Sequence, residues 1–220
     1  MVARSDLVRG MLEIGVVKFG SFLFKRDEGN PNAEPSPIYL NLRKPPKGPL
    51  TDGLIRQYVE DLMYPLLERA NVRFVAVAGV PEAGDSFAGE IARIVRVQQI
   101  FLEKGEKEGK RSIVGIRGDV AIPKGPVLIA DDLVTEAHSK KEAAEVLRNA
   151  GCTVKDVVVL VDYEQGGREE LAEAGLILHE FWRITELLKF YRGAGSIDQE
   201  MYERVVDYLA RNGRPTKSPA

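Results

Sequence analysis

The sequence contains almost no cysteine and no long apolar segment, and both absences restrict the class of protein. Cys152 is the single cysteine among 220 residues, so an intramolecular disulfide is excluded and a reducing compartment is expected. The longest apolar runs fall far short of the roughly 20 residues that cross a bilayer. The first residues also lack the apolar region of a signal peptide. We therefore expect a cytoplasmic protein that does not bind a membrane.

The sequence also lacks an excess of charge of either sign. Lys and Arg number 31 and Asp and Glu number 33, which gives a formal net charge of −2. A strongly basic field would favour nucleic acid as a partner, and it is absent here. No nucleic-acid partner is expected, and any anion-binding site must be local.

Short apolar runs alternate with amphipathic segments through most of the chain. Runs such as FVAVA, VLIAD and DVVVLVD are typical of parallel strands that helices cover on both faces. The pattern predicts an α/β fold with a single domain over residues 1–212 and a flexible tail over residues 213–220. The charged segment KGEKEGKR, between two of the predicted strands, is expected to be a loop.

Several local features outside this alternation are also predicted. A helix is expected behind a Ser5 cap, followed by two short strands in FGSFLF and SPIYLNLR. A helix over residues 52–71 contains Pro65, which predicts a kink or local irregularity. Two helices close the chain, and Asp198 is placed to cap the second.

The stretch VLIADDLVTEAHS places two acids where an apolar strand ends. Burying Asp131 and Asp132 without a partner would be costly, so a divalent cation, a basic group or sugar hydroxyls must compensate them. Thr135 and Ser139 follow at the start of a helix, where hydroxyls and backbone N–H groups can hold phosphate. The pattern favours a phosphorylated ribose as ligand. The alternative is a strand that ends in solvated acids before an ordinary helix cap.

This stretch resembles the phosphoribosyl pyrophosphate (PRPP) motif of type I phosphoribosyltransferases. KFGSFLFK, SPIYLNLR, GVPEAGDSFA, VVVLVDYEQGG and RITELL, in this order, resemble the orotate phosphoribosyltransferase family over residues 15–209. The resemblance implies a mostly parallel central sheet flanked by helices, with a small N-terminal hood. It also implies Mg²⁺-dependent transfer of 5-phosphoribose from PRPP to orotate, with release of pyrophosphate, by a homodimer.

The resemblance assigns roles to particular residues. Asp131 and Asp132 would engage the ribose hydroxyls, and Mg²⁺ would be carried mainly by PRPP with these acids as candidate ligands. Lys104 and Lys107 would close over PRPP from the neighbouring subunit and stabilise the departing pyrophosphate. The other implied contacts are Lys25, Thr135, Glu136, Ala137, His138 and Ser139 for PRPP, Gly79, Val80, Pro81, Glu82, Ala83 and Gly84 for pyrophosphate, and Tyr39 and Tyr163 for the base.

The chain departs from the family pattern at two of these places. Glu136, Ala137 and His138 stand where the family has Thr or Ser, then Gly, then a small residue. A glutamate repels a phosphate dianion, and without glycine the loop loses left-handed conformations. His138, if protonated, could pair with Glu136 or phosphate; the alternative is an exposed residue at a helix start. Tyr163 replaces an arginine and cannot supply a charged fork for a carboxylate.

These departures leave two further functions open. Tyr163 would stack on a ring better than it would bind a carboxylate, which favours a phosphoribosyltransferase for another base. Glu136 and the missing glycines favour a non-catalytic protein that senses PRPP or a nucleotide, or that binds a partner. A nucleotide-binding P-loop in GVPEAGDS is rejected, because Asp85 stands where that motif needs lysine.

Overall fold

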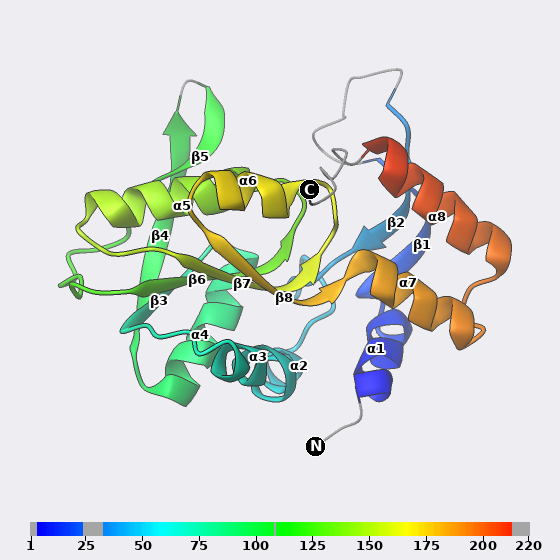
Figure 1. The fold of residues 1–220 in the computed structure, drawn as a ribbon, viewed down its shortest axis with the longest axis horizontal. Helices are drawn as coiled ribbons and strands as arrows, with labels where there is room; N and C mark the ends of the chain where they lie inside the picture. The colour runs from blue at the N-terminus through cyan, green and yellow to red at the C-terminus, as the bar shows by residue number, and fades with distance from the viewer. Residues whose placement is uncertain (1–3, 24–32, 108, 213–220) are drawn as a thin grey trace, which may run out of the picture.

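A six-stranded sheet forms the centre of the molecule (Figure 1), and its strand order is β5-β4-β3-β6-β7-β8. The computed structural model describes residues 4–23, 33–107 and 109–212. All neighbouring strands are parallel except β4 and β5, which are antiparallel. The strands are β3 (Ala76–Gly79), β4 (Gln98–Lys107), β5 (Lys110–Ile116), β6 (Val127–Val134), β7 (Asp156–Asp162) and β8 (Ile177–Arg183).

Helices cover both faces of this sheet, as the continuous apolar strands predict. α5 (His138–Asn149) and α6 (Gly167–Glu173) lie on one face, and α4 (Ala83–Val95) lies on the other (Figure 1). Val157 and Val159 of β7 pack in the cluster that contains α5 and α6 residues, whereas Val158 and Leu160 pack in the cluster that contains α4 residues. The expected α/β class is confirmed.

The helix predicted around Pro65 is irregular at that residue. It comprises α2 (Asp52–Tyr58), a π-helical turn η2 (Val59–Met63) and α3 (Tyr64–Arg69). Proline has no N–H to donate to the preceding turn, so the regular hydrogen-bond ladder cannot continue through it. Thr51 begins the segment, since its hydroxyl accepts from the N–H of Leu54 at 3.3 Å.

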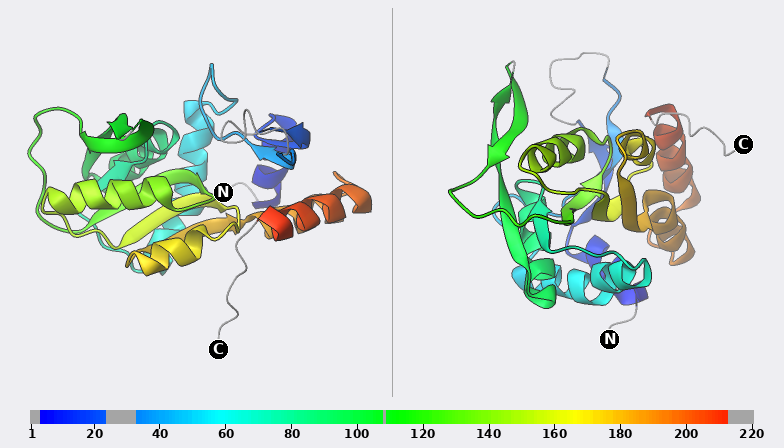
Figure 2. Two further views of the ribbon diagram at one scale, coloured as in Figure 1. Left: turned by 90° about the horizontal axis from the view of Figure 1, so that it is seen from above. Right: turned by 60° about the vertical axis from the view of Figure 1, so that its left-hand side comes forward.

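The remaining elements form a smaller unit at one end of the sheet (Figure 2). β1 (Val17–Phe22) and β2 (Ser36–Leu40) make an antiparallel two-stranded sheet. The same unit contains the helices α1 (Arg4–Glu13), α7 (Ile184–Gly193) and α8 (Gln199–Asn212). The Tyr191 hydroxyl donates to the Val8 carbonyl at 2.8 Å and so joins α7 to α1. The Asp198 cap is confirmed by its 2.8 Å bond from the Met201 N–H. β1, β2 and α1 match the expected N-terminal hood, but the C-terminal helices α7 and α8 belong to the same unit.

Three local expectations were wrong. The charged segment after residue 103 is a β-hairpin that projects past α5 (Figures 1 and 2), in which Lys104 pairs with Ile113 and Lys107 with Lys110. Only the outer parts of β4 and β5 lack the apolar alternation that signals a strand, because they extend beyond the core and each is held by the backbone of the other. β6 continues through the two acids to Val134, and the first helix starts at Arg4 and contains Ser5.

No described helix is both long and apolar enough to span a bilayer. The predicted tail over residues 213–220 and the predicted PRPP contact Lys25 lie outside the described residues.

Candidate functional site

The site lies at the carboxyl ends of β3 and β6, two neighbouring strands whose following connections run to opposite sides of the sheet. The chain passes from β3 to β4 on one side, while β6 lies on the other side of β3, so the loops after β3 and β6 meet at the carboxyl ends of the strands. These loops are in close contact: the Val80 N–H donates to the Ala130 carbonyl at 3.0 Å. A Cβ on Gly84 would lie 2.5 Å from the same carbonyl oxygen, so only glycine fits there.

The two acids of β6 have different surroundings. Asp131 is buried and forms an ion pair with Lys140, which is also buried. Asp132 is partly exposed, and its Oδ1 accepts from the Leu133 N–H at 2.8 Å. Burial and the neighbouring Asp131 raise the pKa of Asp132, and Lys140 opposes that shift. A basic group from the chain itself therefore provides part of the predicted compensation.

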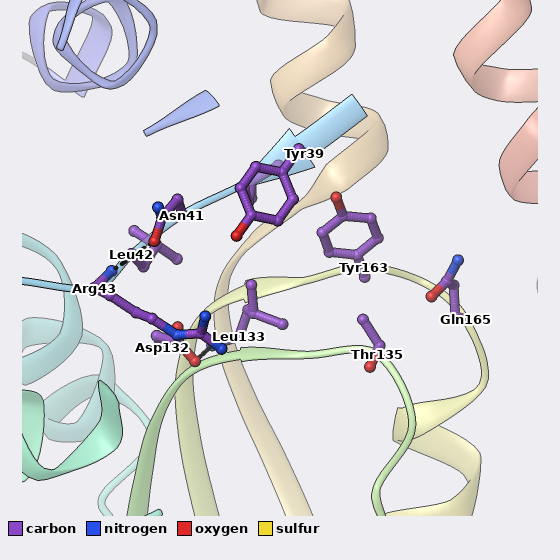
Figure 3. A pocket seen from close by; sticks show the side chains of 10 residues that line it. Tyr39, Asn41, Leu42, Arg43, Asp132, Leu133, Thr135, Tyr163 and Gln165 are labelled. Carbon is purple, nitrogen blue, oxygen red and sulfur yellow. Dashed lines mark hydrogen bonds between the residues drawn. The ribbon is translucent and has the colours of Figure 1, made fainter. Parts of the chain in front are cut away.

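One cavity lies between β2 and the ends of β6 and β7, and we call it the ring pocket (Figure 3). Its volume is about 290 Å³. Tyr39 and Tyr163 lie on the same side of it, and the Tyr163 hydroxyl donates to the Ile38 carbonyl at 3.4 Å. The lining residues are Tyr39, Leu40, Asn41, Leu42, Arg43, Asp132, Leu133, Thr135, Tyr163 and Gln165.

A second cavity, the charged pocket, lies on the other side of Asp132 and has a volume of about 330 Å³. Basic and acidic side chains from four separate segments meet there. Lys47 and Glu82 form an ion pair across it. Burial lowers the pKa of Lys104, and Glu82 opposes this shift. The lining residues are Arg43, Lys47, Val80, Pro81, Glu82, Ala83, Lys104, Arg111, Asp131, Asp132 and Ser139.

The two predicted loop lysines occupy different positions. Lys104 lines the charged pocket of its own chain, and its arrival from a neighbouring subunit stays a prediction. Lys107 lies at the exposed end of the hairpin and is not among the residues that line this pocket. Arg111, on the returning strand, does line it. The antiparallel return of β5 brings Arg111 back toward the sheet, and a loop prediction could not show this.

Sequence reasoning also missed Arg43 and Lys47. Arg43 lines both pockets, and its guanidinium lies beside Asp132 in Figure 3. Both residues lie in the segment between α2 and β2, the strand that supplies Tyr39. Their basic character, so close to a predicted base contact, was the available signal.

The predicted phosphate loop bridges the two pockets. Thr135 lines the ring pocket and Ser139 lines the charged pocket. Ala137 is buried at the N-cap of α5 and provides no side-chain cap. Glu136 is exposed. The side chain of His138 is 74% exposed and lies 3.1 Å from Glu142, which matches the simpler interpretation of an exposed residue at a helix start.

Hydrogen bonds of the residues on either side of Tyr163 fix the turn that follows β7. Glu164 has a left-handed φ of 55°, its N–H donates to Asp162 at 2.8 Å, and its carboxylate accepts from the Thr185 N–H at 3.0 Å. Burial raises the pKa of Asp162. The amide nitrogen of Gln165 is buried without a hydrogen-bond partner among the described residues. These bonds fix the direction of the turn that carries Tyr163 into the ring pocket.

Asp85 is an unexpected acid beside the charged pocket. It lies in the first turn of α4, and its Oδ1 is buried without a hydrogen-bond partner among the described residues. Burial raises the pKa of Asp85 to about 6, an effect that Arg117 opposes and Asp131 reinforces. Among the described residues, no cluster of three or more His, Cys, Asp or Glu could hold a metal ion.

Comparison with known proteins places the chain in a family. The model of the phosphoribosyl transferase domain matches residues 50–179. This segment contains the whole central sheet up to β8, together with the acidic pair and the loop that follows it. The chain therefore belongs to the phosphoribosyl transferase domain family.

Sequence relatives define the similarity more narrowly. The chain is 31% identical over 216 residues to uridine 5'-monophosphate synthase of Bos taurus, covering 97% of this chain and 42% of that protein. It is 26% identical to orotate phosphoribosyltransferase of Sulfolobus acidocaldarius, covering 94% and 98%. These relatives confirm the resemblance to the orotate phosphoribosyltransferase family. The chain spans about two fifths of the uridine 5'-monophosphate synthases that it matches.

Solved structures agree with this relationship. UMP synthase of Leishmania donovani has a TM-score of 0.73 at 28% identity, over 96% of this chain and 43% of that chain. Orotate phosphoribosyltransferase of Aeropyrum pernix has a TM-score of 0.67 at 25% identity, over 87% of this chain and 99% of that chain. The type I phosphoribosyltransferase fold is confirmed.

Proposed function

We propose that the protein transfers 5-phosphoribose from PRPP to orotate, forming orotidine 5'-monophosphate and releasing pyrophosphate. One observation carries the proposal: the ring pocket and the charged pocket share Asp132 and Arg43. A ribose held at Asp132 would have a base on one side and an anion on the other. The names of the relatives, orotate phosphoribosyltransferase and uridine 5'-monophosphate synthase, support the same reaction.

The residues divide the chemistry between the two pockets. The transition state of such a transfer is an oxocarbenium-like ribose with negative charge on the departing pyrophosphate. Lys104, Lys47 and Arg111 line the charged pocket and would stabilise that charge, while the loop after β6 would hold the 5'-phosphate. Catalysis would then consist of positioning and electrostatic stabilisation, without a covalent nucleophile.

We propose Mg²⁺ as the cofactor, held mainly by the oxygens of PRPP. Asp132 suits a role as an additional oxygen ligand, because it borders the charged pocket, whereas the chain's own lysine already pairs with Asp131. When bound, Mg²⁺ would neutralise part of the pyrophosphate charge. A homodimer in the cytoplasm also belongs to this proposal, by analogy with the family.

Arg43 supports a carboxylate-bearing base such as orotate. Tyr163 cannot provide the fork that the family's arginine supplies, but the Arg43 guanidinium borders the same pocket as the two tyrosines. A neutral base remains the second candidate, because the tyrosines stack on any planar ring. A screen of bases under identical conditions separates the two: product from orotate alone supports the first, and product from an uncharged base supports the second.

The first experiment is calorimetric titration with PRPP and Mg²⁺, followed by an assay for orotidine 5'-monophosphate. We expect binding and turnover by the unmodified protein. Glu136→Gly and Glu136→Gln remove a negative charge from the phosphate loop and are expected to tighten PRPP binding several-fold, more at low salt. Glu145→Gln removes an exposed glutamate elsewhere on α5 and serves as the control.

Two results would contradict the proposal. Binding of PRPP without product from any base would favour a sensing protein. If PRPP binds only after Glu136 is replaced, the native loop does not accept the phosphate, and a partner-binding protein becomes the better explanation.

A further inference from the structure

One carboxylate of α5, that of Glu142, is bonded to the β4–β5 hairpin. Its Oε2 accepts from the backbone N–H of Ile113 at 3.0 Å, and its Oε1 accepts from the Ser112 hydroxyl. His138, one turn earlier on α5, lies 3.1 Å from the same Oε1. The Glu142 side chain is only 16% exposed. A largely buried carboxylate that accepts from two consecutive residues of a strand restricts that strand more strongly than a solvated ion pair would.

The bonds to Glu142 lie opposite Lys104 on the hairpin. In the antiparallel register, Ile113 pairs with Lys104 and Ser112 pairs with Gly105. β5 lies at the edge of the sheet, where a strand has backbone pairing along one side only. Glu142 therefore gives β5 a second attachment, and this attachment is directly across the hairpin from Lys104.

The backbone beside Lys104 is irregular, which makes the direction of its side chain sensitive to such an attachment. The register shifts between Glu103 and Lys104, and Val114 is the extra residue on β5. A bulge of this kind bends the strand and changes where neighbouring side chains point. Gly105 packs closely against the extra residue, since a Cβ on it would lie 2.8 Å from Cγ2 of Val114.

The same helix connects this attachment to the charged pocket. Ser139 and Glu142 are three residues apart on α5, which places them on one side of the helix. Ser139 lines the charged pocket together with Lys104 and Arg111. α5 therefore borders the pocket with one residue and, one turn later, holds the hairpin that brings basic groups to it.

Apolar packing alone would fix the hairpin less precisely. Ile113 is buried and belongs to the apolar cluster that contains Ala143 and Ala144 of α5. Such contacts hold β5 against the helix, but they are not directional. The hydrogen bonds to Glu142 are directional and so also determine the position of β5 along the helix.

We infer that Glu142 is a positioning residue, which fixes the strand opposite Lys104 and thereby keeps the Lys104 ammonium in the charged pocket. The inference rests on the proposed function, because it concerns the charge that stabilises the leaving pyrophosphate of that reaction. Within the described part of the chain, Glu142 lines neither the ring pocket nor the charged pocket, so it acts through Lys104 and not on the substrate.

The test begins with Glu142→Met, which keeps the length of the side chain and removes both acceptors. We expect the affinity for pyrophosphate, measured by calorimetry with Mg²⁺ present, to fall about 10-fold, and kcat for orotidine 5'-monophosphate formation to fall about 10- to 100-fold. The affinity for ribose 5-phosphate should change by less than about twofold, because that ligand does not reach the hairpin.

Two further variants of α5 identify the cause of these losses. Glu142→Gln can still accept from the Ile113 N–H, and its amide can donate to the Ser112 hydroxyl, so it should restore most of the pyrophosphate affinity. Glu145→Met changes an exposed glutamate on the same helix and is the matched control, which should alter neither affinity. If Glu142→Gln loses as much affinity as Glu142→Met, the charge of Glu142 matters and not its bonds to β5, and the inference is wrong.

A double-mutant cycle tests whether Glu142 acts through Lys104. In protein that already carries Lys104→Gln, the positioned charge is absent, so Glu142→Met should lower kcat by less than about threefold further. A residue with a general structural role would instead lower kcat by the same factor with and without Lys104. Equal factors would therefore overturn the inference.

The remaining outcomes separate the inference from the function on which it rests. If Glu142→Met weakens pyrophosphate and ribose 5-phosphate equally, it loosens the whole site and the inference is wrong. If the unmodified protein forms no orotidine 5'-monophosphate, but Glu142→Met still weakens pyrophosphate binding selectively, the proposed function fails and the positioning role stands. If the unmodified protein does not bind pyrophosphate at all, both fail.

Discussion

The ring pocket and the charged pocket are neighbours of similar size but opposite character. Apolar and aromatic groups make most of the ring pocket, and Arg43 and Asp132 are its charged residues. The charged pocket has four basic and three acidic residues, contributed by the β2–α2 segment, the loop after β3, the hairpin and β6. The difference separates two tasks: binding a planar ring by contact area, and binding a polyanion by charge.

The charged pocket contains acidic as well as basic side chains. Glu82 lies among the basic groups of the charged pocket, in the loop expected to face pyrophosphate, and Asp85 follows it in the first turn of α4. Lys47 lowers the pKa of Glu82 by a direct hydrogen bond, so part of the basic charge is already used before any ligand binds. The charged pocket therefore has less free positive charge than its number of lysines and arginines suggests.

The largest expected effect concerns Lys104 in the charged pocket. Lys104→Gln should lower kcat about 100- to 1,000-fold with a smaller change in KM, because it removes a preorganised charge beside the leaving group. Steady-state assays with PRPP and orotate measure this. Lys107→Gln, which removes the same charge from the hairpin end, is the matched control and should cost far less. Equal losses would mean that the hairpin end reaches a site, as a neighbouring subunit's hairpin would allow.

The second effect concerns the free energy of unfolding, which the buried, ionised carboxylate of Asp85 lowers. Burial raises its pKa from 3.8 to about 6, so the folded protein holds a proton that the unfolded chain has released between these values. The contribution of Asp85 to stability therefore falls as the pH rises through this window and stays low above it. Asp85→Asn should stabilise the protein by about 1–3 kcal/mol near pH 8, with little difference near pH 4.

Denaturant unfolding at both pH values measures this effect. Asp119→Asn, at an exposed position, serves as the control. A difference between Asp85→Asn and the unmodified protein that does not depend on pH would show that the cost is not one of ionisation.

The smallest expected effect concerns Tyr39 in the ring pocket. Tyr39→Leu removes a ring but keeps an apolar side chain, and it should raise KM for the base about tenfold, the size of a lost stacking contact. KM for PRPP should stay within about twofold, because Tyr39 does not line the charged pocket. If the KM values for the base and for PRPP rise together, the two pockets do not bind base and PRPP separately.

Much of the fold was predictable because local patterns determine it. The apolar runs placed the parallel strands, Asp198 was recognised as a cap, and Pro65 marked the irregular helix. The outer part of the hairpin was missed because it extends beyond the core and carries no apolar alternation. Lys25 and the tail lie outside the described residues, so those predictions remain untested, as does the division into a domain and a tail.

The site was predictable only in part, for a similar reason. The pattern placed Asp131, Asp132 and the loop after them at the carboxyl end of a strand, where ligands bind in such sheets. It could not show that Arg43 and Arg111 would join them, since each belongs to a different segment of the chain. Lys140 was one of two adjacent lysines on a predicted helix, and nothing in the spacing marked it as buried.

The sequence by itself determined the α/β class, the family resemblance and the position of the acidic pair. These depend on periodicity and on neighbours along the chain. Only the tertiary structure decided that Asp131 forms an ion pair with Lys140, which basic groups line the charged pocket, and that both pockets share Asp132. Burial and pairing depend on groups that folding brings together from distant segments, and that information is not present in any local pattern.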